Sequence, residues 1–267
     1  GLLCAANMQI NGDQADLQRT MDRVLIGDGT DAENAIVAYW NSLREAGTRA
    51  HPPIGMLHLD PARPRDAQRH EIDEMEPAIG AVLRAWSNHL ETGPRGPAIL
   101  LDLSPRLNET QRSLVDAVIE TTFPGIPRTW EFLSQGGGRI DRLSVWIGSL
   151  SSQERSRCVR MGKKNIMATI EGEAAESELI TLSTPPPYGA YLTIVDSALV
   201  KSGLHDAWLE KALPEGTGHS WLRLDGRRPL LISTDPLIRD DEIDAFVIAS
   251  GEIVPVSYTH LTLPTKA

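Results

Sequence analysis

Four polar side chains lie near the ends of apolar runs, and their types suit proton transfer or metal binding. His58 and Asp60 close the run GMLHLD, Asp102 lies in AILLDLS, and Glu171 lies near the end of NIMATIEG. Carboxylate oxygens are the ligands that Mg²⁺ prefers, and histidine and carboxylate side chains also act as general acids and bases. We therefore predict a catalytic set and a smaller metal-binding set: His58, Asp60, Asp102 and Glu171 for catalysis, and Asp60, Asp102 and Glu171 for a divalent cation such as Mg²⁺.

Structural roles explain the same acidic residues without any chemistry. Asp60 precedes Pro61 and would cap a turn, Asp102 would cap its loop or pair with Arg106, and Glu171 would be solvated. This alternative stays open at the level of the sequence.

A local basic cluster stands out in a chain whose formal net charge is -10. It lies within ten residues and is predicted to bind a phosphate or nucleotide beside the sheet: Arg155, Arg157, Arg160, Lys163 and Lys164. A solvated helix face, with cations that offset the helix dipole, is the alternative interpretation. The net negative charge argues against broad nucleic-acid binding.

Helical and strand patterns alternate along the chain and indicate how these residues are positioned. Helices are predicted at Asp13–Leu25, at Thr30–Ala46 with a Thr30–Glu33 capping box, after Pro77, after a cap formed by Asn108 and Gln111, and at Glu154–Met161. Strands are predicted at Gly55–Asp60, Ala98–Ser104, Arg142–Ser149 and Asn165–Gly172. This alternation predicts an α/β fold with an open, mainly parallel sheet and flanking helices. Ligands of such sheets bind beyond the carboxyl ends of the strands, which is where the four candidates lie.

The remainder of the chain has a different pattern of predicted helices and strands. Residues 185–255 predict a smaller α+β region with a β-hairpin, formed by WLRLD and PLLIST. We place an α/β domain at residues 1–184 and leave open whether residues 185–255 form a second domain or part of the first. Residues 256–265 read VSYTHLTLPT, which resembles translated transposon-adapter read-through, so residues 256–267 are expected to be a non-native tail. A genuine strand is the alternative.

Several catalytic motifs are absent from the sequence. There is no P-loop, no G-x-S-x-G nucleophile elbow, no H-E-x-x-H and no C-x-x-C. The string IGDGTD at residues 26–31 resembles the GDGxxD loop of haloacid-dehalogenase phosphatases, although its two aspartates are one residue too close. Helix capping explains the string, and its acidic residues would repel a phosphate unless a cation intervened.

Composition bounds the remaining possibilities. With 41% hydrophobic and 23% charged residues and no long apolar run, we expect a soluble, cytoplasmic protein without a membrane span. The chain begins at Gly1, so we expect preceding sequence to be missing, which leaves a signal peptide open. Two hypotheses follow: an enzyme acting on a phosphorylated or other anionic small substrate, or a noncatalytic, degenerate nucleotide-binding or assembly module. The sequence carries no indication of the oligomeric state.

Overall fold

The structure is a computed structural model that describes residues 27–45, 47, 54–62, 72–175, 179–182, 184–222 and 228–255. Two predicted segments lie outside the described residues: the helix at residues 13–25 and the tail at residues 256–267.

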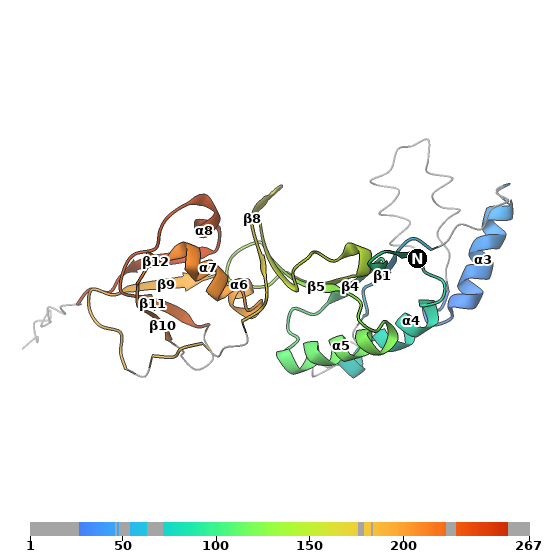
Figure 1. The fold of residues 1–267 in the computed structure, drawn as a ribbon, viewed down its shortest axis with the longest axis horizontal. Helices are drawn as coiled ribbons and strands as arrows, with labels where there is room; N and C mark the ends of the chain where they lie inside the picture. The colour runs from blue at the N-terminus through green and yellow to red at the C-terminus, as the bar shows by residue number, and fades with distance from the viewer. Residues whose placement is uncertain are drawn as a thin grey trace, which may run out of the picture. The chain divides into compact units, whose positions relative to one another are not determined.

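The fold is of the mixed α/β class, which confirms the predicted class (Figure 1). A mixed sheet with a mostly parallel core has the strand order β1-β4-β6-β5-β7-β8, and a smaller antiparallel sheet has the order β10-β11-β9-β12. The strands of the larger sheet are β1 (Leu57–Leu59), β4 (Ile99–Leu103), β5 (Arg128–Ser134), β6 (Arg142–Ile147), β7 (Ser156–Met161) and β8 (Ile166–Gly172). β1 pairs with β4 and β5 pairs with β7 in parallel, whereas β4 with β6 and β7 with β8 are antiparallel.

Contacts divide the chain into two compact units. The first unit comprises Gly1–Thr129 and Leu143–Gln153, and the second comprises Trp130–Arg142 and Glu154–Ala267. These divisions differ from the predicted boundary at residue 184, which stays a prediction about domains.

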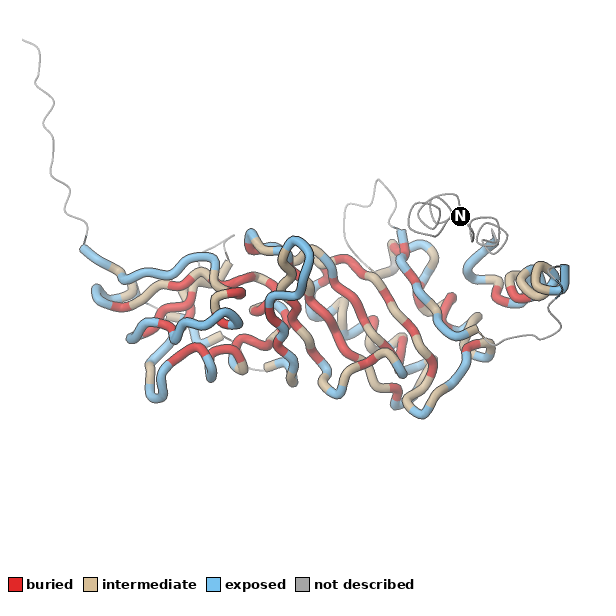
Figure 2. Tube along the Cα trace, turned by 90° about the horizontal axis from the view of Figure 1, so that it is seen from above, coloured by how far each residue is buried: buried red, intermediate tan, exposed pale blue. Residues whose placement is uncertain are grey.

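In the first unit, the two faces of the sheet differ because side chains alternate along each strand. Ile99, Leu101 and Leu103 of β4 are buried, whereas the two residues between them are half-buried. The helices α4 (Ile79–Trp86) and α5 (Glu109–Thr122) lie on one side of these strands in Figure 1. Their buried apolar residues and those of the strands form the core of this unit, and Figure 2 shows the resulting mixture of buried and half-buried positions. The opposite face of β4 carries Leu100 and Asp102, which are half-buried.

One predicted helix cap of the first unit forms and another does not. Asn108 and Gln111 form a capping box at the start of α5, as predicted. The helix α3 (Ala32–Glu45) also forms, but its first turn is capped by Asp31, whose Oδ1 accepts from the Asn34 N–H. The predicted Thr30 cap is wrong because Thr30 instead donates to Asp28. A short 3₁₀ turn (Ile72–Glu74) precedes Pro77, and α4 begins after it.

Two short strands and a 3₁₀ turn complete the first unit. β2 (Thr92–Gly93) pairs with β3 (Gly96–Pro97), and the 3₁₀ turn is Gly148–Leu150. Gly148 has a φ of 65°, and a Cβ there would lie 1.9 Å from the Pro97 carbonyl oxygen, so only glycine fits this approach.

The second unit contains the smaller sheet and three short helices. Its elements are β9 (Tyr191–Val195), α6 (Ser197–Lys201), α7 (His205–Ala212), β10 (His219–Leu222), β11 (Leu230–Ser233), α8 (Asp241–Ala245) and β12 (Val247–Glu252). The antiparallel pair β10–β11 confirms the predicted hairpin. Trp208, Trp221 and Phe246 are fully buried and anchor the core of this unit. Every helix among the described residues of the chain is too short or too polar to cross a lipid bilayer.

One predicted helix is wrong. Residues 156–161 form β7 rather than a helix, because the segment pairs on both sides, with β5 and with β8. Ser151 and Glu154 have the spacing of a capping box, which predicts the start of this helix, but Ser151 instead donates to the Gly148 carbonyl and accepts from Arg95. Tertiary pairing therefore overrides the local helix signal. The neighbouring strand β5 was not predicted at all.

Candidate functional site

The first unit brings together two of the four predicted catalytic residues. His58 Nε2 lies 3.0 Å from Asp102 Oδ2, and Ser144 Oγ donates to Asp102 Oδ1 at 2.6 Å. Asp102 thus uses one carboxylate oxygen for each neighbour. The result is a chain of three side chains with the carboxylate in the middle.

Strand register explains why these three side chains meet. His58 of β1 is aligned with Leu100 of β4, and Ser144 of β6 is aligned with Asp102. Aligned residues and residues two apart share a face of the sheet. His58, Asp102 and Ser144 therefore lie on the face opposite to Leu101 and the apolar core.

Burial differs sharply along this chain of side chains. The Asp102 side chain is 12% exposed and the His58 side chain is 51% exposed, whereas Ser144 is fully buried. A buried carboxylate needs polar partners in place of water, and His58 and Ser144 each contact one of its oxygens. With Nε2–H of a neutral imidazole donated to Asp102, the lone pair of the ring lies on Nδ1. His58 is then the accessible end of the chain and Ser144 its buried end.

A pocket of about 480 Å³ adjoins His58. Its lining comes from the loop before α3, from one side of α3, from residues in and before β1, and from α4: Gly27, Asp28, Gly29, Asp31, Asn34, Ala35, Ile36, Ala38, Tyr39, Ile54, Met56, Leu57, His58 and Trp86. The Trp86 indole N–H donates to the Gly29 carbonyl at 2.8 Å and fixes the loop against α4. This volume lies within the range of about 300–1,000 Å³ that is typical of small-molecule sites.

The predicted metal-binding set does not assemble as a cluster. Among the described residues, no group of three His, Cys, Asp or Glu side chains could hold a metal ion. Asp60 is exposed, Asp102 is engaged by His58 and Ser144, and Glu171 accepts from Arg157 at 3.3 Å. Asp102 thus lies at its predicted strand end but with partners that the sequence did not indicate.

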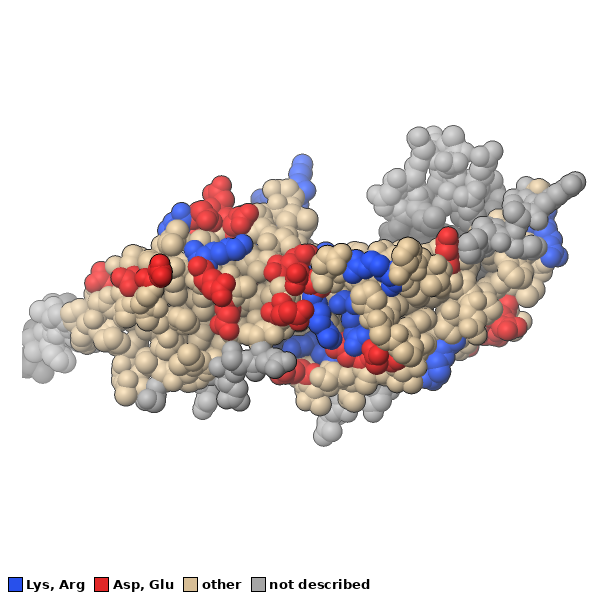
Figure 3. Space-filling model, in the orientation of Figure 1, with Lys and Arg blue, Asp and Glu red and all other residues tan. Residues whose placement is uncertain are grey.

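The basic cluster lies in the second unit, on β7 and at the turn that leads to β8. Arg157 pairs with Glu131 at 2.7 Å and with Glu171, and Arg160 donates to the carbonyls of Met161 and Ala245. Arg155, Lys163 and Lys164 are exposed. Because β7 is a strand, Arg157 and Arg160, three residues apart, belong to opposite faces, so the alternative interpretation of a solvated helix face is wrong. On the face drawn in Figure 3, basic side chains gather in several separate places among acidic ones.

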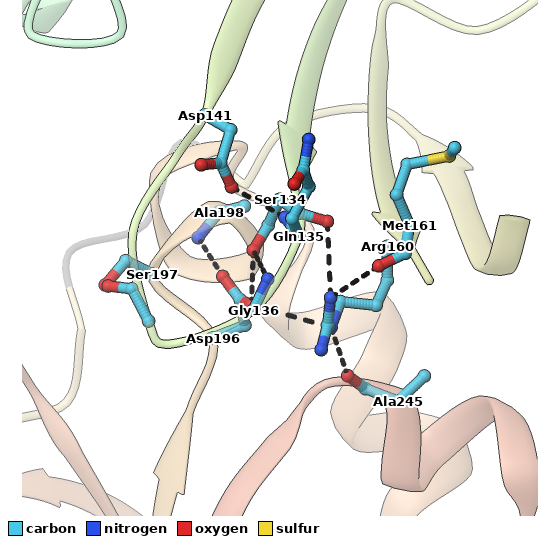
Figure 4. A network of polar contacts seen from close by, with 11 residues as sticks. Ser134, Gln135, Gly136, Asp141, Arg160, Met161, Asp196, Ser197, Ala198 and Ala245 are labelled. Atoms are coloured by element: carbon cyan, nitrogen blue, oxygen red, sulfur yellow. Dashed lines mark hydrogen bonds and ion pairs between the residues drawn. The ribbon is translucent and has the colours of Figure 1, made fainter. Parts of the chain in front are cut away.

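A buried polar network, which the sequence did not reveal, lies at the ends of β5, β7 and β9 (Figure 4). Ser134 Oγ donates to Asp196 Oδ2 at 2.7 Å, Asp196 Oδ1 accepts from the Ala198 N–H, and Arg160 Nε lies 4.0 Å from Asp196 Oδ2. The Gly136 N–H donates to Ser134 Oγ. Asp196 and Ser134 are buried and hydrogen-bonded to each other, so the network fastens strand ends together.

Cys158 is not a reactive nucleophile in this structure. It is buried in β7, and burial raises the pKa of its thiol far above the ordinary value. The thiol form dominates and nucleophilic attack is suppressed.

Comparison with known proteins finds no matching family model, no similar curated protein and no similar solved structure.

Proposed function

We propose that this chain is an enzyme in which His58, supported by Asp102, transfers protons to or from a small molecule held in the adjoining pocket. The observation that carries the proposal is the 3.0 Å contact between His58 Nε2 and Asp102 Oδ2 at the wall of that pocket. A half-exposed histidine whose ring is held by a largely buried carboxylate has two properties that a general base needs: access to a ligand and a fixed orientation.

The proposed proton path begins at Nδ1 of His58. This nitrogen removes a proton from the ligand or from a water molecule, while Nε2–H stays hydrogen-bonded to Asp102. The imidazolium that forms is stabilised by the negative charge of Asp102, and the proton is then returned to the product or to solvent. Catalysis of this kind contributes about 10²- to 10⁴-fold in rate.

Ser144 is a positioning residue in this proposal. Its hydroxyl donates to Asp102 Oδ1 and is fully buried, so it does not reach a ligand. By holding one carboxylate oxygen, it directs the other toward His58. The geometry differs from a serine nucleophile with a histidine base, because here serine and histidine both contact the aspartate.

An activity screen with matched histidine variants tests the proposal. The full chain is assayed for hydrolysis and proton-exchange reactions on panels of small esters, amides and ketones. We expect His58→Gln to lower kcat at least about 100-fold. His89→Gln is the control, because His89 belongs to the same unit but does not line the pocket.

The same screen distinguishes the competing functions. Full activity in His58→Gln would refute the assignment of His58. Ligand binding to the pocket without turnover in any panel would favour the noncatalytic binding module. The predicted preference for an anionic substrate is a separate question, because the described residues that line this pocket include no lysine or arginine.

A further inference from the structure

The charge of the pocket wall is the feature that the proton-transfer proposal leaves unexplained. Among the described residues that line the pocket, Asp28 and Asp31 are the carboxylates, and there is no lysine or arginine to balance them. The remaining lining is mainly apolar and aromatic, with Tyr39 and Trp86 as the large side chains. A pocket of this composition disfavours a phosphate or carboxylate ligand.

Asp28 retains an acceptor that its local turn does not use. The Thr30 N–H and the Thr30 hydroxyl both donate to Oδ1, at 2.9 and 2.7 Å. These bonds, the backbone one first, lower the pKa of Asp28 below its ordinary value, so the carboxylate stays charged. Its second oxygen, Oδ2, has no hydrogen bond in the described structure and can accept one from a ligand.

Asp31 adds a second negative charge beside the first. Its Oδ1 accepts from the Asn34 N–H at 3.1 Å, and its Oδ2 accepts from the Asn34 side-chain amide at 2.6 Å. Capping α3 accounts for these bonds, and the positive end of the helix offsets part of the charge. A helix terminus carries only about half an elementary charge, so two carboxylates leave the wall negative.

The aromatic side chains complete a site for an organic cation. Aromatic ring faces attract cations and also pack against apolar groups. The Trp86 indole N–H donates to the carbonyl of Gly29, the residue that follows Asp28. This hydrogen bond holds the indole next to the loop that carries the Asp28 carboxylate. Ala35, Ile54 and Met56 provide apolar surface in the same pocket.

We propose that this pocket selects a small protonated amine with an apolar body. The ammonium group is held by Asp28 with support from Asp31, and the apolar body packs against Tyr39, Trp86 and the aliphatic lining. That this amine is the substrate on which His58 acts rests on the proposed function. The preference for a positively charged ligand depends only on the residues of the pocket wall.

Three probes of similar shape and different charge test the selection. Binding of 2-phenylethylamine, 2-phenylethanol and 3-phenylpropionate to the full chain is measured by isothermal titration calorimetry at neutral pH. We expect the amine to bind at least tenfold more tightly than the alcohol and the anion to bind most weakly. We also expect the affinity for the amine to fall as the salt concentration rises.

Isosteric variants assign the preference to the wall. Asparagine keeps the acceptor oxygen that caps a turn or helix, so Asp28→Asn and Asp31→Asn remove charge while retaining the local bonds. We expect each to weaken amine binding about two- to fivefold, as for exposed ion pairs, and the double variant about tenfold. Glu33→Gln is the matched control, because Glu33 lies in the first turn of α3 but does not line the pocket.

The outcomes separate this inference from the proposed function. Equal binding of amine and alcohol, tighter binding of the anion, absence of amine binding, or equal losses in Glu33→Gln and the double variant would each overturn the amine selection. If the native chain prefers the amine but His58→Gln keeps full turnover, the proton-transfer function fails and the amine selection stands. If it abolishes turnover while the amine preference is absent, the function stands and the selection fails.

Discussion

Removal of the Asp196 carboxylate is the sharpest test of how the second unit holds its strand ends together. The Asp196 side chain is 2% exposed and the Arg160 side chain 17% exposed, so water does not replace their lost contacts. Asp196→Ala takes an acceptor from the Ser134 hydroxyl and from the Ala198 N–H, and leaves the Arg160 guanidinium without its nearby anion.

The expected cost follows from these contacts. Breaking a buried ion pair by removing one partner costs about 3–5 kcal/mol. Arg160 keeps its bonds to the carbonyls of Met161 and Ala245, which places the expected cost at the lower end, about 3 kcal/mol. Asp196→Asn keeps the oxygen that caps α6, so its expected cost is smaller, about 2 kcal/mol.

Urea unfolding measures both costs, with tryptophan fluorescence and circular dichroism as probes. Asp241→Asn is the control, because Asp241 is an exposed acidic residue in the first turn of α8, and its expected effect is within about 0.5 kcal/mol. If two transitions are resolved, only one of them should shift in the Asp196 variants. A cost below about 1 kcal/mol for Asp196→Ala, or equal costs for alanine and asparagine, would refute the reasoning.

Three further predictions follow from other buried groups. Ser144→Ala should lower the free energy of unfolding by about 1 kcal/mol. With a substrate from the activity screen, it should lower kcat with little change in KM, because Ser144 positions Asp102 without touching the ligand. An unchanged kcat would contradict that role. Burial lowers the pKa of His205 below its ordinary value of 6.5, so the unfolded chain binds the proton more readily and the free energy of unfolding falls as the pH drops below about 6.5. Urea titrations at several pH values should show that His205→Gln loses this part of the pH dependence; an unchanged slope would argue against it. In a Cys4→Ser background, Cys158 should react with a thiol reagent only at the rate of unfolding, and rapid labelling of the native protein would show that it is accessible.

Local signals in the sequence predicted most of the elements of the first unit. The capping box of Asn108 and Gln111 forms because its partners are three residues apart and need no distant contact. The apolar run around Leu101 becomes a buried strand because every alternate side chain faces the core. The position of Asp102 near a strand end is likewise predicted by the run itself.

Other elements depended on contacts between segments far apart in the chain. The sequence predicts a helix at Glu154–Met161, yet β5 and β8 pair with residues 156–161 on both sides and make them a strand. In this strand Arg160 donates to the carbonyls of Met161 and Ala245, so the alternative interpretation of a solvated helix face does not apply to it.

The sequence by itself determined the α/β class, the caps that begin α5, and His58 and Asp102 as residues with suitable chemistry near the ends of strands. Only the tertiary structure decided that these two side chains form a pair, that Ser144 contacts Asp102 from 42 residues away, and that Glu171 binds Arg157 instead. The physical reason is that composition and periodicity specify which face a side chain occupies, whereas strand order and register specify which neighbours it meets there.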